Sequence, residues 1–243
     1  MKYLELTLAT PAENLACDEA LLDLCEEGGC TDEVLRVWES RDYFVVVGYG
    51  NKVATEVNLA ACRARGIPVL RRCSGGGTVL QGPGCLNYAL ILKIAEAGPL
   101  RSISAANRFI MERNRDAVQS AIGSRQPGIS VRGHTDLVVG GRKFSGNSQR
   151  RRKQFLLFHG TFLLNFEIAL VEALLWPPSK APAYRQSRTH AEFLTNLDVS
   201  ADGVKAALRR CWKAAADLTS IREERTRELV EQKYSAKSWN RKF

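Results

Sequence analysis

Apolar residues recur with helical spacing in some segments and in short continuous runs in others, and capping residues mark where several segments begin. The clearest start lies near the N-terminus, where Thr10 can cap a helix, Pro11 suits its first turn and Glu13 completes a capping box. This helix should run to about Glu27, because two glycines follow it. The pattern therefore predicts an opening helix of about four turns.

Two further helical regions follow from the same spacing. Apolar positions between residues 103 and 121 lie on one helical face, and Gly123 stands near the end of that segment. Towards the C-terminus, Ser200 can cap another helix, and Ser220 with Glu223 forms a second possible capping box. We therefore expect helices before, between and after the remaining segments.

Short runs rich in β-branched and aromatic residues predict strands. These runs cover residues 34–38, 44–47, 68–70, 87–94, 136–139 and 156–164. Strands grouped mostly in the middle, with helices around them, favour an α/β (α+β) sandwich over the regular alternation of a Rossmann fold. No internal repeat or low-complexity linker divides the chain, so we expect a single domain over residues 1–243.

Composition narrows the class of protein. The chain has 243 residues, of which 45% are hydrophobic and 25% charged, as in ordinary globular proteins. The net charge of +9 suggests an acidic partner, which could be nucleic acid, a phosphate ligand or an acidic protein, or else a solvated basic surface. Seven scattered cysteines and three histidines argue against a disulfide framework or a zinc site. With neither a secretory segment nor a membrane-spanning run, we expect a reduced, cytoplasmic, soluble protein.

Three consecutive glycines, Gly75 to Gly77, follow the segment Arg71 to Ser74. Such a run costs backbone entropy and buries no side chain, so a tight loop or a closely approaching ligand should compensate for it. The two arginines could neutralise a phosphate through charge-assisted hydrogen bonds, whereas a flexible turn explains the glycines alone. The segment matches neither GxxxxGK[ST] nor GxGxxG, the two common phosphate-binding patterns.

Gly140-Gly141 predicts a hairpin turn between two short strands. The side chains of Arg142 and Lys143 would then project from a rigid β-hairpin. A surface hairpin with solvated charges is the alternative interpretation of the same residues.

Two other features have a simple structural explanation beside a functional one. The basic run from Arg150 to Lys153 could bind an acidic protein, although a solvated loop accounts for it as well. His159 lies within an apolar run, where a lone histidine is usually a hydrogen-bonded core residue. Neither feature establishes a function by itself.

Taken together, the segments resemble the lipoate–protein ligase family in their order and spacing. The matching segments are Gly48 to Asn51, Glu56 to Asn58, RRCSGGGTV, Leu86-Asn87, TDLVVGGRKFSGNSQ and FHGTFLL. Asn14 to Glu19 resembles the family's opening helix, and Lys233-Tyr234 with Trp239-Asn240 resembles its closing element. The resemblance implies a mixed β-sheet sandwich flanked by helices, as in biotin ligases and class II aminoacyl-tRNA synthetases. Biotin ligases carry a GRGR-type loop where this chain has SGGG, so lipoate is favoured.

The resemblance also implies a reaction and a set of site residues. Ligases of this type activate lipoate with Mg-ATP to lipoyl-AMP and transfer the lipoyl group to a lysine of a carrier protein. Lys143 matches the family's central lysine and is the expected catalytic residue, and Asp136 matches the aspartate near the ATP phosphates, where Mg²⁺ is expected through oxygen ligands. The residues expected to bind the lipoyl and adenylate groups are Arg72, Ser74, Gly75, Gly76, Gly77, Thr78, Asn87, Ser145, Gly146, His159 and Gly160.

The chain departs from the family pattern in two places and ends early. Gln81-Gly82 stands where the family usually has His-Asp, and Gly84-Cys85 where it tends to have Gly-Asn. The resemblance further implies that activation needs a small accessory domain. Because the chain stops at Phe243, we expect this domain to be absent from the chain. A separate accessory subunit could supply it. The other expected partner is a lipoyl domain or another carrier protein, acidic in view of the +9 charge.

Two alternatives remain. Octanoyl- and lipoyltransferases on the same fold use a cysteine nucleophile and no ATP, but neither family position for that cysteine holds one here, since Leu156-Leu157 and residues 128–133 lack cysteine. Cys73 and Cys85 lie near the predicted pocket, where buried small hydrophobes are the simpler interpretation. A non-catalytic lipoate- or RNA-binding module is the other alternative, and simple binding would not require Lys143 at the carboxyl end. We therefore expect a ligase without a nucleic-acid or membrane partner.

Overall fold

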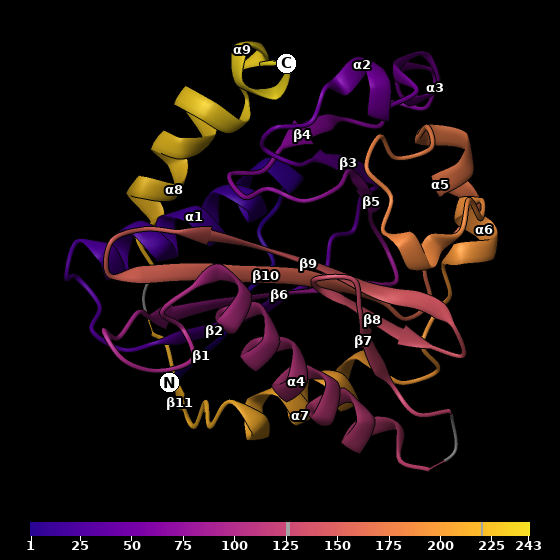
Figure 1. Ribbon diagram of the computed structural model, residues 1–243. Helices are drawn as coiled ribbons and strands as arrows, with labels where there is room; N and C mark the ends of the chain where they lie inside the picture. The colour runs from indigo at the N-terminus through magenta and orange to yellow at the C-terminus, as the bar shows by residue number, and fades with distance from the viewer. Residues whose placement is uncertain (125–126, 220) are drawn as a thin grey trace.

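The computed structural model describes residues 1–124, 127–219 and 221–243, which form two β-sheets with helices around them (Figure 1). Within these residues the larger sheet has the strand order β11-β1-β2-β6-β10-β9-β8-β7, and the smaller has the order β4-β3-β5. The larger sheet consists of β1 (Lys2–Glu5), β2 (Val34–Trp38), β6 (Cys85–Lys93), β7 (Ser130–Arg132), β8 (Asp136–Val139), β9 (Arg142–Arg151), β10 (Phe155–Leu163) and β11 (Ala216–Asp217). The smaller sheet consists of β3 (Phe44–Val47), β4 (Val69–Arg71) and β5 (Val79–Gln81).

Helices connect and cover these strands. They are α1 (Pro11–Glu26), α2 (Val53–Glu56), α3 (Leu59–Ala64), α4 (Ile103–Ile122), α5 (Ala169–Leu174), α6 (His190–Phe193), α7 (Ala201–Cys211), α8 (Glu223–Leu229) and α9 (Lys237–Asn240). A 3₁₀ turn, η1 (Ala183–Arg185), and a π-helical turn, η2 (Val230–Tyr234), complete the set. None of the helices in the described ranges is both long enough and apolar enough to cross a membrane.

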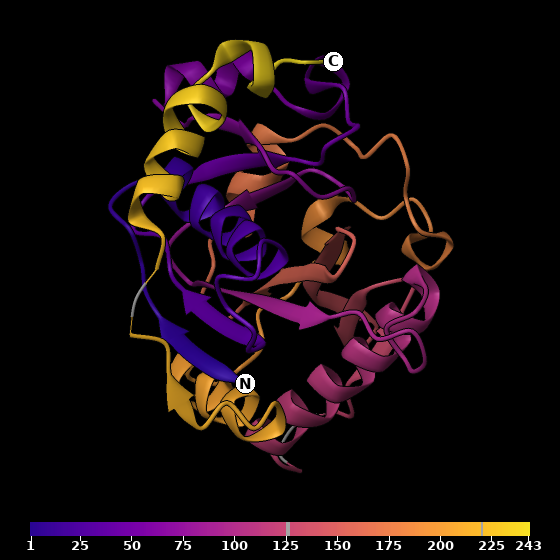
Figure 2. The same ribbon diagram turned by 90° about the vertical axis from the view of Figure 1, so that its left-hand side faces the viewer.

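The large sheet has a different cover on each face. In Figure 1, α4 and α7 lie below it, and Figure 2 shows these two helices side by side. On the other face α1 packs against β6 and β10, with Leu21 among its buried contacts, and the small sheet lies next to α1. The central strands β6 and β10 are buried on both faces because helices cover both sides. A cavity lies between the large and small sheets.

The expected fold class is confirmed, since the large sheet is mixed. Strand β1 runs parallel to β2 and β11, whereas β2, β6, β10, β9 and β8 pair antiparallel. The opening helix begins as predicted, with the Thr10–Glu13 capping box formed, and Gly123 follows α4 with φ +64. The hairpin turn is also confirmed, because Gly140 and Gly141 adopt φ values of +55 and +77 that favour glycine.

The strand boundaries differ from the predicted ones by one or two residues. The strand predicted at 68–70 is Val69–Arg71, and the one predicted at 87–94 is Cys85–Lys93. Ser220 lies outside the described residues, and α8 begins at Glu223 with Arg222 at its N-cap. The Ser220–Glu223 capping box therefore rests on a residue outside the described ranges and stays a prediction.

The solvated loop expected for Arg150 to Lys153 is present only in part, because Arg150 and Arg151 belong to β9 whereas Arg152 and Lys153 lie in the exposed turn that follows it. Strand β9 extends through Arg151, and the Arg152 guanidinium forms an ion pair of 2.9 Å with Asp23 of α1. The Glu26 carboxylate accepts hydrogen bonds from three backbone N–H groups of the following turn. Helix α1 therefore supplies carboxylates that hold the β9–β10 turn, and charge composition alone could not indicate this packing.

Candidate active site

Most of the predicted site residues converge on a cavity of about 500 Å³ between the two sheets and the segment 176–194. The predicted residues that line it are Arg72, Gly76, Gly77, Thr78, Asn87, Asp136, Lys143, Ser145, Gly146, His159 and Gly160. Ser74 and Gly75 are not among the lining residues, since Ser74 is buried beside the cavity and Gly75 is exposed on the loop. Segments far apart in the sequence thus assemble one site.

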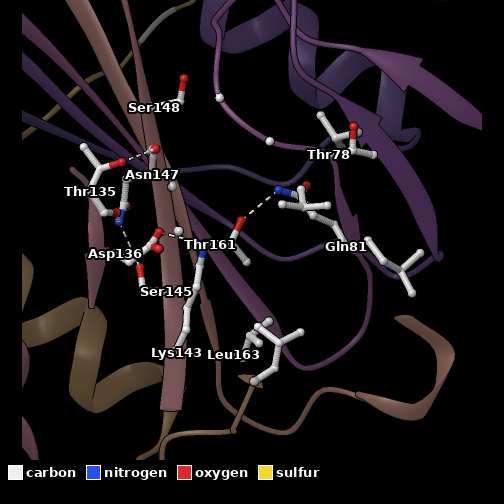
Figure 3. A pocket seen from close by; sticks show the side chains of 18 of the residues that line it. Thr78, Gln81, Thr135, Asp136, Lys143, Ser145, Asn147, Ser148, Thr161 and Leu163 are labelled. Atoms are coloured by element: carbon white, nitrogen blue, oxygen red, sulfur yellow. Dashed lines mark hydrogen bonds and ion pairs between the residues drawn. The ribbon is translucent and has the colours of Figure 1, made fainter. Parts of the chain in front are cut away.

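A row of directly opposed residues crosses the cavity face of the large sheet. Thr161 of β10 lies opposite Asn87 of β6 and Gly146 of β9, and Gly146 lies opposite Asp136 of β8. Trp38 of β2 extends the row beyond Asn87. Directly opposed residues of neighbouring strands share a face, and all five of these residues line the cavity. Figure 3 shows Thr161 and Asp136 in this arrangement.

A β-bulge in β9 aims Lys143 into the cavity. Leu137 pairs with Ser145 and Val138 pairs with Lys143, so Phe144 is an extra residue in the ladder. Phe144 is fully buried in the core on the α4 side of the sheet. The extra residue changes the alternation of side chains, so Lys143 shares the cavity face with Gly146 instead of pointing into the α4 core.

The Lys143 ammonium lies next to Asp136 and above Gly146. Its Nζ is 2.7 Å from Asp136 Oδ1, and the Tyr184 hydroxyl donates to Asp136 Oδ2 over 2.7 Å. A Cβ added to Gly146 would lie 2.8 Å from Lys143 Nζ, so a side chain there would displace the ammonium. The side chains of Lys143 and Asp136 are 22% and 13% exposed. Lys143 is therefore a half-buried cavity residue and not a solvated hairpin charge.

The triple-glycine loop packs tightly against neighbouring backbone. A Cβ on Gly48 would lie 2.1 Å from the Gly76 carbonyl oxygen, and Gly76 itself has φ +85. The Tyr49 N–H donates to the Ser74 carbonyl over 2.8 Å, which joins the two segments. The three glycines therefore belong to a tight loop, as one of the sequence interpretations predicted, and not to a flexible turn.

Both arginines before the loop donate to the protein itself, which corrects the idea that they offer free donors to a phosphate. Arg71 donates to backbone carbonyls of residues 48–51 and of the C-terminal residues 239 and 240. The Arg72 guanidinium donates to the Gly75 and Gly77 carbonyls at 2.6 and 2.7 Å. Burial lowers the pKa of Arg72 to about 10. Arg72 therefore satisfies backbone carbonyls of the loop, and Arg71 joins the segment 48–51 to the C-terminal residues.

His159 joins a buried polar network behind the loop. Its Nε2 lies 2.5 Å from Ser74 Oγ, and its Nδ1 lies 3.4 Å from Asp18 Oδ2. Asp18 also accepts from Arg36 over 2.5 Å, and both of these residues are almost wholly buried. The side chain of His159 is therefore hydrogen-bonded at both nitrogens, as expected for a core histidine, although His159 also lines the cavity.

The cysteines near the site are buried and lie outside the cavity wall. Burial raises the pKa of both the Cys73 and Cys85 thiols to about 12. Neither residue lines the cavity, and each is at most 4% exposed. A thiol with a raised pKa and no access to the site lacks the features of a nucleophile.

Sequence reasoning missed several residues that shape the site. Asp18 and Thr161 lie within segments that carry the family resemblance, yet neither was singled out. Residues of the segment 176–194 line part of the cavity wall, and Tyr184 of this segment donates a hydrogen bond to Asp136. That segment has no strong apolar periodicity, so only its three-dimensional path shows its contribution.

Comparison with known proteins places this site in a family. The model of the lipoyl protein ligase A/B catalytic domain matches residues 10–210. Lipoate-protein ligase A subunit 1 of Thermoplasma acidophilum is 27% identical, over 97% of this chain and 95% of the relative. Octanoyltransferase LipM of Geobacillus kaustophilus is also 27% identical, over 98% of this chain and 97% of the relative.

Solved structures give the same result. A lipoate-protein ligase A bound with ATP superposes with a TM-score of 0.79 and 27% identity, over 99% of each chain. Protein Ta0514 of T. acidophilum with bound lipoic acid has a TM-score of 0.79 and 26% identity, over 99% of this chain and 98% of the other. The resemblance drawn from the sequence motifs is confirmed. The chain belongs to the lipoyl protein ligase A/B catalytic domain family.

Proposed function

We propose that this protein is a lipoate–protein ligase that activates lipoate with Mg-ATP and transfers the lipoyl group to a lysine of a carrier protein. The observation that carries the proposal is the Lys143 ammonium on the wall of a cavity that no cysteine lines within the described residues. The relatives support both substrates, since one solved structure holds lipoic acid and another holds ATP.

The reaction has two steps. In the first, a lipoate carboxylate oxygen attacks the α-phosphorus of ATP, and pyrophosphate leaves with the electron pair of the broken P–O bond. In the second, the uncharged lysine amine of the carrier attacks the acyl carbonyl carbon, a C–N bond forms, AMP leaves with the C–O electron pair, and the amine loses a proton to solvent. Negative charge develops on oxygen in both steps, and a fixed cation at Lys143 stabilises it.

The rest of the cavity suits an acyl chain. Apolar surface of its wall comes from Leu15, Trp38, Val46, Leu163 and Leu175. Burying roughly six methylenes of lipoate at about 0.8 kcal/mol each would contribute on the order of 5 kcal/mol of gross binding free energy. An apolar chain with one charged end thus matches the apolar walls and the ammonium group of Lys143.

Asp136 fits the expected role near magnesium. Mg²⁺ prefers oxygen ligands and is often held by one or two carboxylates together with nucleotide phosphates and water. Asp136 supplies such a carboxylate beside Lys143, although both of its oxygens now accept hydrogen bonds from the protein. When bound, the ion would neutralise phosphate charge, and Asp136 would exchange a contact with Lys143 or Tyr184 for the ion.

ATP-independent octanoyl transfer is the second candidate, because an octanoyltransferase is as similar in sequence as the ligase subunit. Substitution of the cysteines distinguishes the ligase from the transferase, because only the transferase needs a cysteine nucleophile. We expect each single Cys→Ser variant, including Cys73→Ser and Cys85→Ser, to keep the wild-type rate of ATP-dependent carrier modification within about two-fold, provided that it folds. Intact mass of the carrier measures this rate. Transfer from an octanoyl carrier protein without ATP, lost in one of these variants, would favour the transferase instead.

We further propose that the carrier is a lipoyl domain and that a second polypeptide assists activation. A relative named subunit 1 is matched over 95% of its length, which supports a divided ligase. The lone chain should then form lipoyl-AMP slowly but transfer readily from supplied lipoyl-AMP, and the partner should restore the first step. Pyrophosphate release measures activation, and carrier mass measures transfer. Full pyrophosphate release by the lone chain would remove the need for a partner.

Within the basic run from Arg150 to Lys153, Arg150 is the candidate for contact with an acidic carrier, because it lies near the glycine loop. Arg152 pairs with Asp23, whereas Arg150 lies over the Tyr49 ring, 6.0 Å from its centroid, beside the segment that contacts the loop. If the carrier is acidic, Arg150→Glu should lower kcat/KM for the carrier about ten-fold at low salt, and the effect should shrink as salt rises. Lys153→Glu makes the same charge change at the far turn and serves as the control. Equal effects of both variants would contradict local steering.

A further inference from the structure

Three polar side chains form a hydrogen-bond chain on the cavity wall near Lys143. Gln81 Nε2 donates to Thr161 Oγ1 over 2.7 Å, and the Thr161 hydroxyl donates to Asn87 Oδ1 over 2.6 Å. Figure 3 shows Thr161 between Gln81 on one side and Lys143 with Asp136 on the other. All of these residues line the cavity, so the chain borders the place where a ligand would lie.

This chain leaves one donor and one acceptor without a partner. The hydroxyl has a single hydrogen, so Thr161 can donate to only one of the two amides. Among the described residues, Asn87 Nδ2 and Gln81 Oε1 have no hydrogen-bond partner, although Asn87 is 2% and Gln81 8% exposed. Interchanging oxygen and nitrogen in both amides reverses the chain but again leaves one donor and one acceptor. Buried polar groups are normally satisfied, so these two atoms point to a ligand.

The strand register fixes where that ligand group would lie. Thr161 is directly opposite both Asn87 and Gly146, and Gly146 is the residue above which the Lys143 ammonium rests. Neighbouring strands are about 4.8 Å apart, so the Asn87 amide and the Lys143 ammonium flank a space about two strands wide. A group between them would meet a cation on one side and a neutral amide donor on the other.

We propose that Gln81, Thr161 and Asn87 form a subsite for the reacting carbonyl of the acyl substrate and for the amine that attacks it. The Asn87 amide N–H donates to the acyl carbonyl oxygen, and Gln81 Oε1 accepts from an N–H of the carrier lysine. Thr161 holds both amides in the orientation that leaves these atoms free. The inference rests on the proposed function and adds the residues that orient the acyl group.

The chemistry of the transfer step agrees with a hydrogen-bond donor at the acyl carbonyl and an acceptor at the attacking amine. The carbonyl oxygen gains negative charge as the amine attacks, so a donor placed there stabilises the transition state more than the bound substrate. The amine keeps a hydrogen while its lone pair forms the new C–N bond, and an acceptor on that hydrogen fixes the direction of attack. Neither amide gains or loses a proton, so the subsite orients the reactants without acid–base chemistry.

Binding of two matched analogues tests the carbonyl contact without turnover. The probes are adenosine carrying an N-octanoylsulfamoyl group and its N-octyl counterpart, in which a methylene replaces the carbonyl. Calorimetry with the wild-type chain should show a preference for the octanoyl analogue, and Thr161→Val should reduce that preference about ten-fold, the size of effect expected for one buried hydrogen bond. Thr161→Ser keeps the hydroxyl and should retain the wild-type preference.

The comparison separates the subsite from the proposed function and from the fold. An unchanged ratio in Thr161→Val would overturn the subsite, whereas failure of the wild-type chain to bind either analogue would overturn both the subsite and the ligase proposal. Gln81→Met has nearly the same shape and no acceptor, so it should keep the analogue preference while slowing transfer from supplied lipoyl-AMP to the carrier about ten-fold. Wild-type transfer by a folded Gln81→Met variant would contradict the amine contact.

Discussion

Lys143→Ala is expected to reduce both lipoyl-AMP formation and transfer to the carrier by at least about 10²-fold in kcat. The ammonium stands in the cavity beside Asp136, and removal of one fixed group that stabilises developing charge commonly costs about 2.7–4 kcal/mol of transition-state stabilisation. Pyrophosphate release reports the first step, and intact carrier mass after addition of lipoyl-AMP reports the second.

The same variant should remain folded. The Lys143–Asp136 pair is partly exposed, and such pairs contribute about 1 kcal/mol or less, while Asp136 keeps its hydrogen bond from Tyr184. Arg142→Ala removes the neighbouring cation on the same strand, which donates to a backbone carbonyl of α6, and serves as the matched control. A Lys143→Ala protein that modifies the carrier at the wild-type rate would refute the assignment.

Asp18→Ala is expected to cause the largest loss of stability. Asp18 and Arg36 form an ion pair of 2.5 Å with side-chain exposures of 3% and 0%. Removing one partner of a buried pair leaves an uncompensated charge and typically costs about 3–5 kcal/mol, a large share of the roughly 5–15 kcal/mol that stabilises a domain. Chemical denaturation measures the change in the free energy of unfolding.

Asp202 provides an exposed carboxylate as the control for Asp18→Ala. Asp202 also lies near a lysine, Lys205, but its side chain is 94% exposed. Asp202→Ala should therefore change the free energy of unfolding by less than about 0.5 kcal/mol. Equal losses in the two variants would mean that the buried pair with Arg36 does not hold α1 against β2.

Local signals predicted the elements well because they depend on neighbouring residues. The Thr10–Glu13 capping box and the paired glycines Gly140 and Gly141 each specify a structure within a few residues, and both formed as expected. The family resemblance predicted the mixed sheet, and most of the site residues that it predicted line the cavity, because the matching motifs lie on strands and loops that meet there.

Long-range features could not be predicted from local patterns. The bulge at Phe144 depends on the pairing of β9 with β8, and without it Lys143 would not share the cavity face. Arg72 lines the cavity as predicted, but the hydrogen bonds from its guanidinium to the loop carbonyls at positions 75 and 77 could not be predicted from the sequence. The contact between Ser74 Oγ and His159 Nε2, which joins residues 85 positions apart in the sequence, could not be predicted either. These partners are set by packing between elements.

We propose that an acyl-adenylate is the donor for modification of a carrier lysine at the Lys143 cavity. The most direct test incubates the purified chain and a lipoyl domain, without ATP, with one of two donors in separate reactions: lipoyl-AMP or an octanoyl carrier protein. The intact mass of the lipoyl domain is then measured. We predict addition of one lipoyl group from lipoyl-AMP, loss of that activity in Lys143→Ala, and no modification from the octanoyl carrier protein. Modification from the octanoyl carrier protein alone, with none from lipoyl-AMP, would contradict the claim.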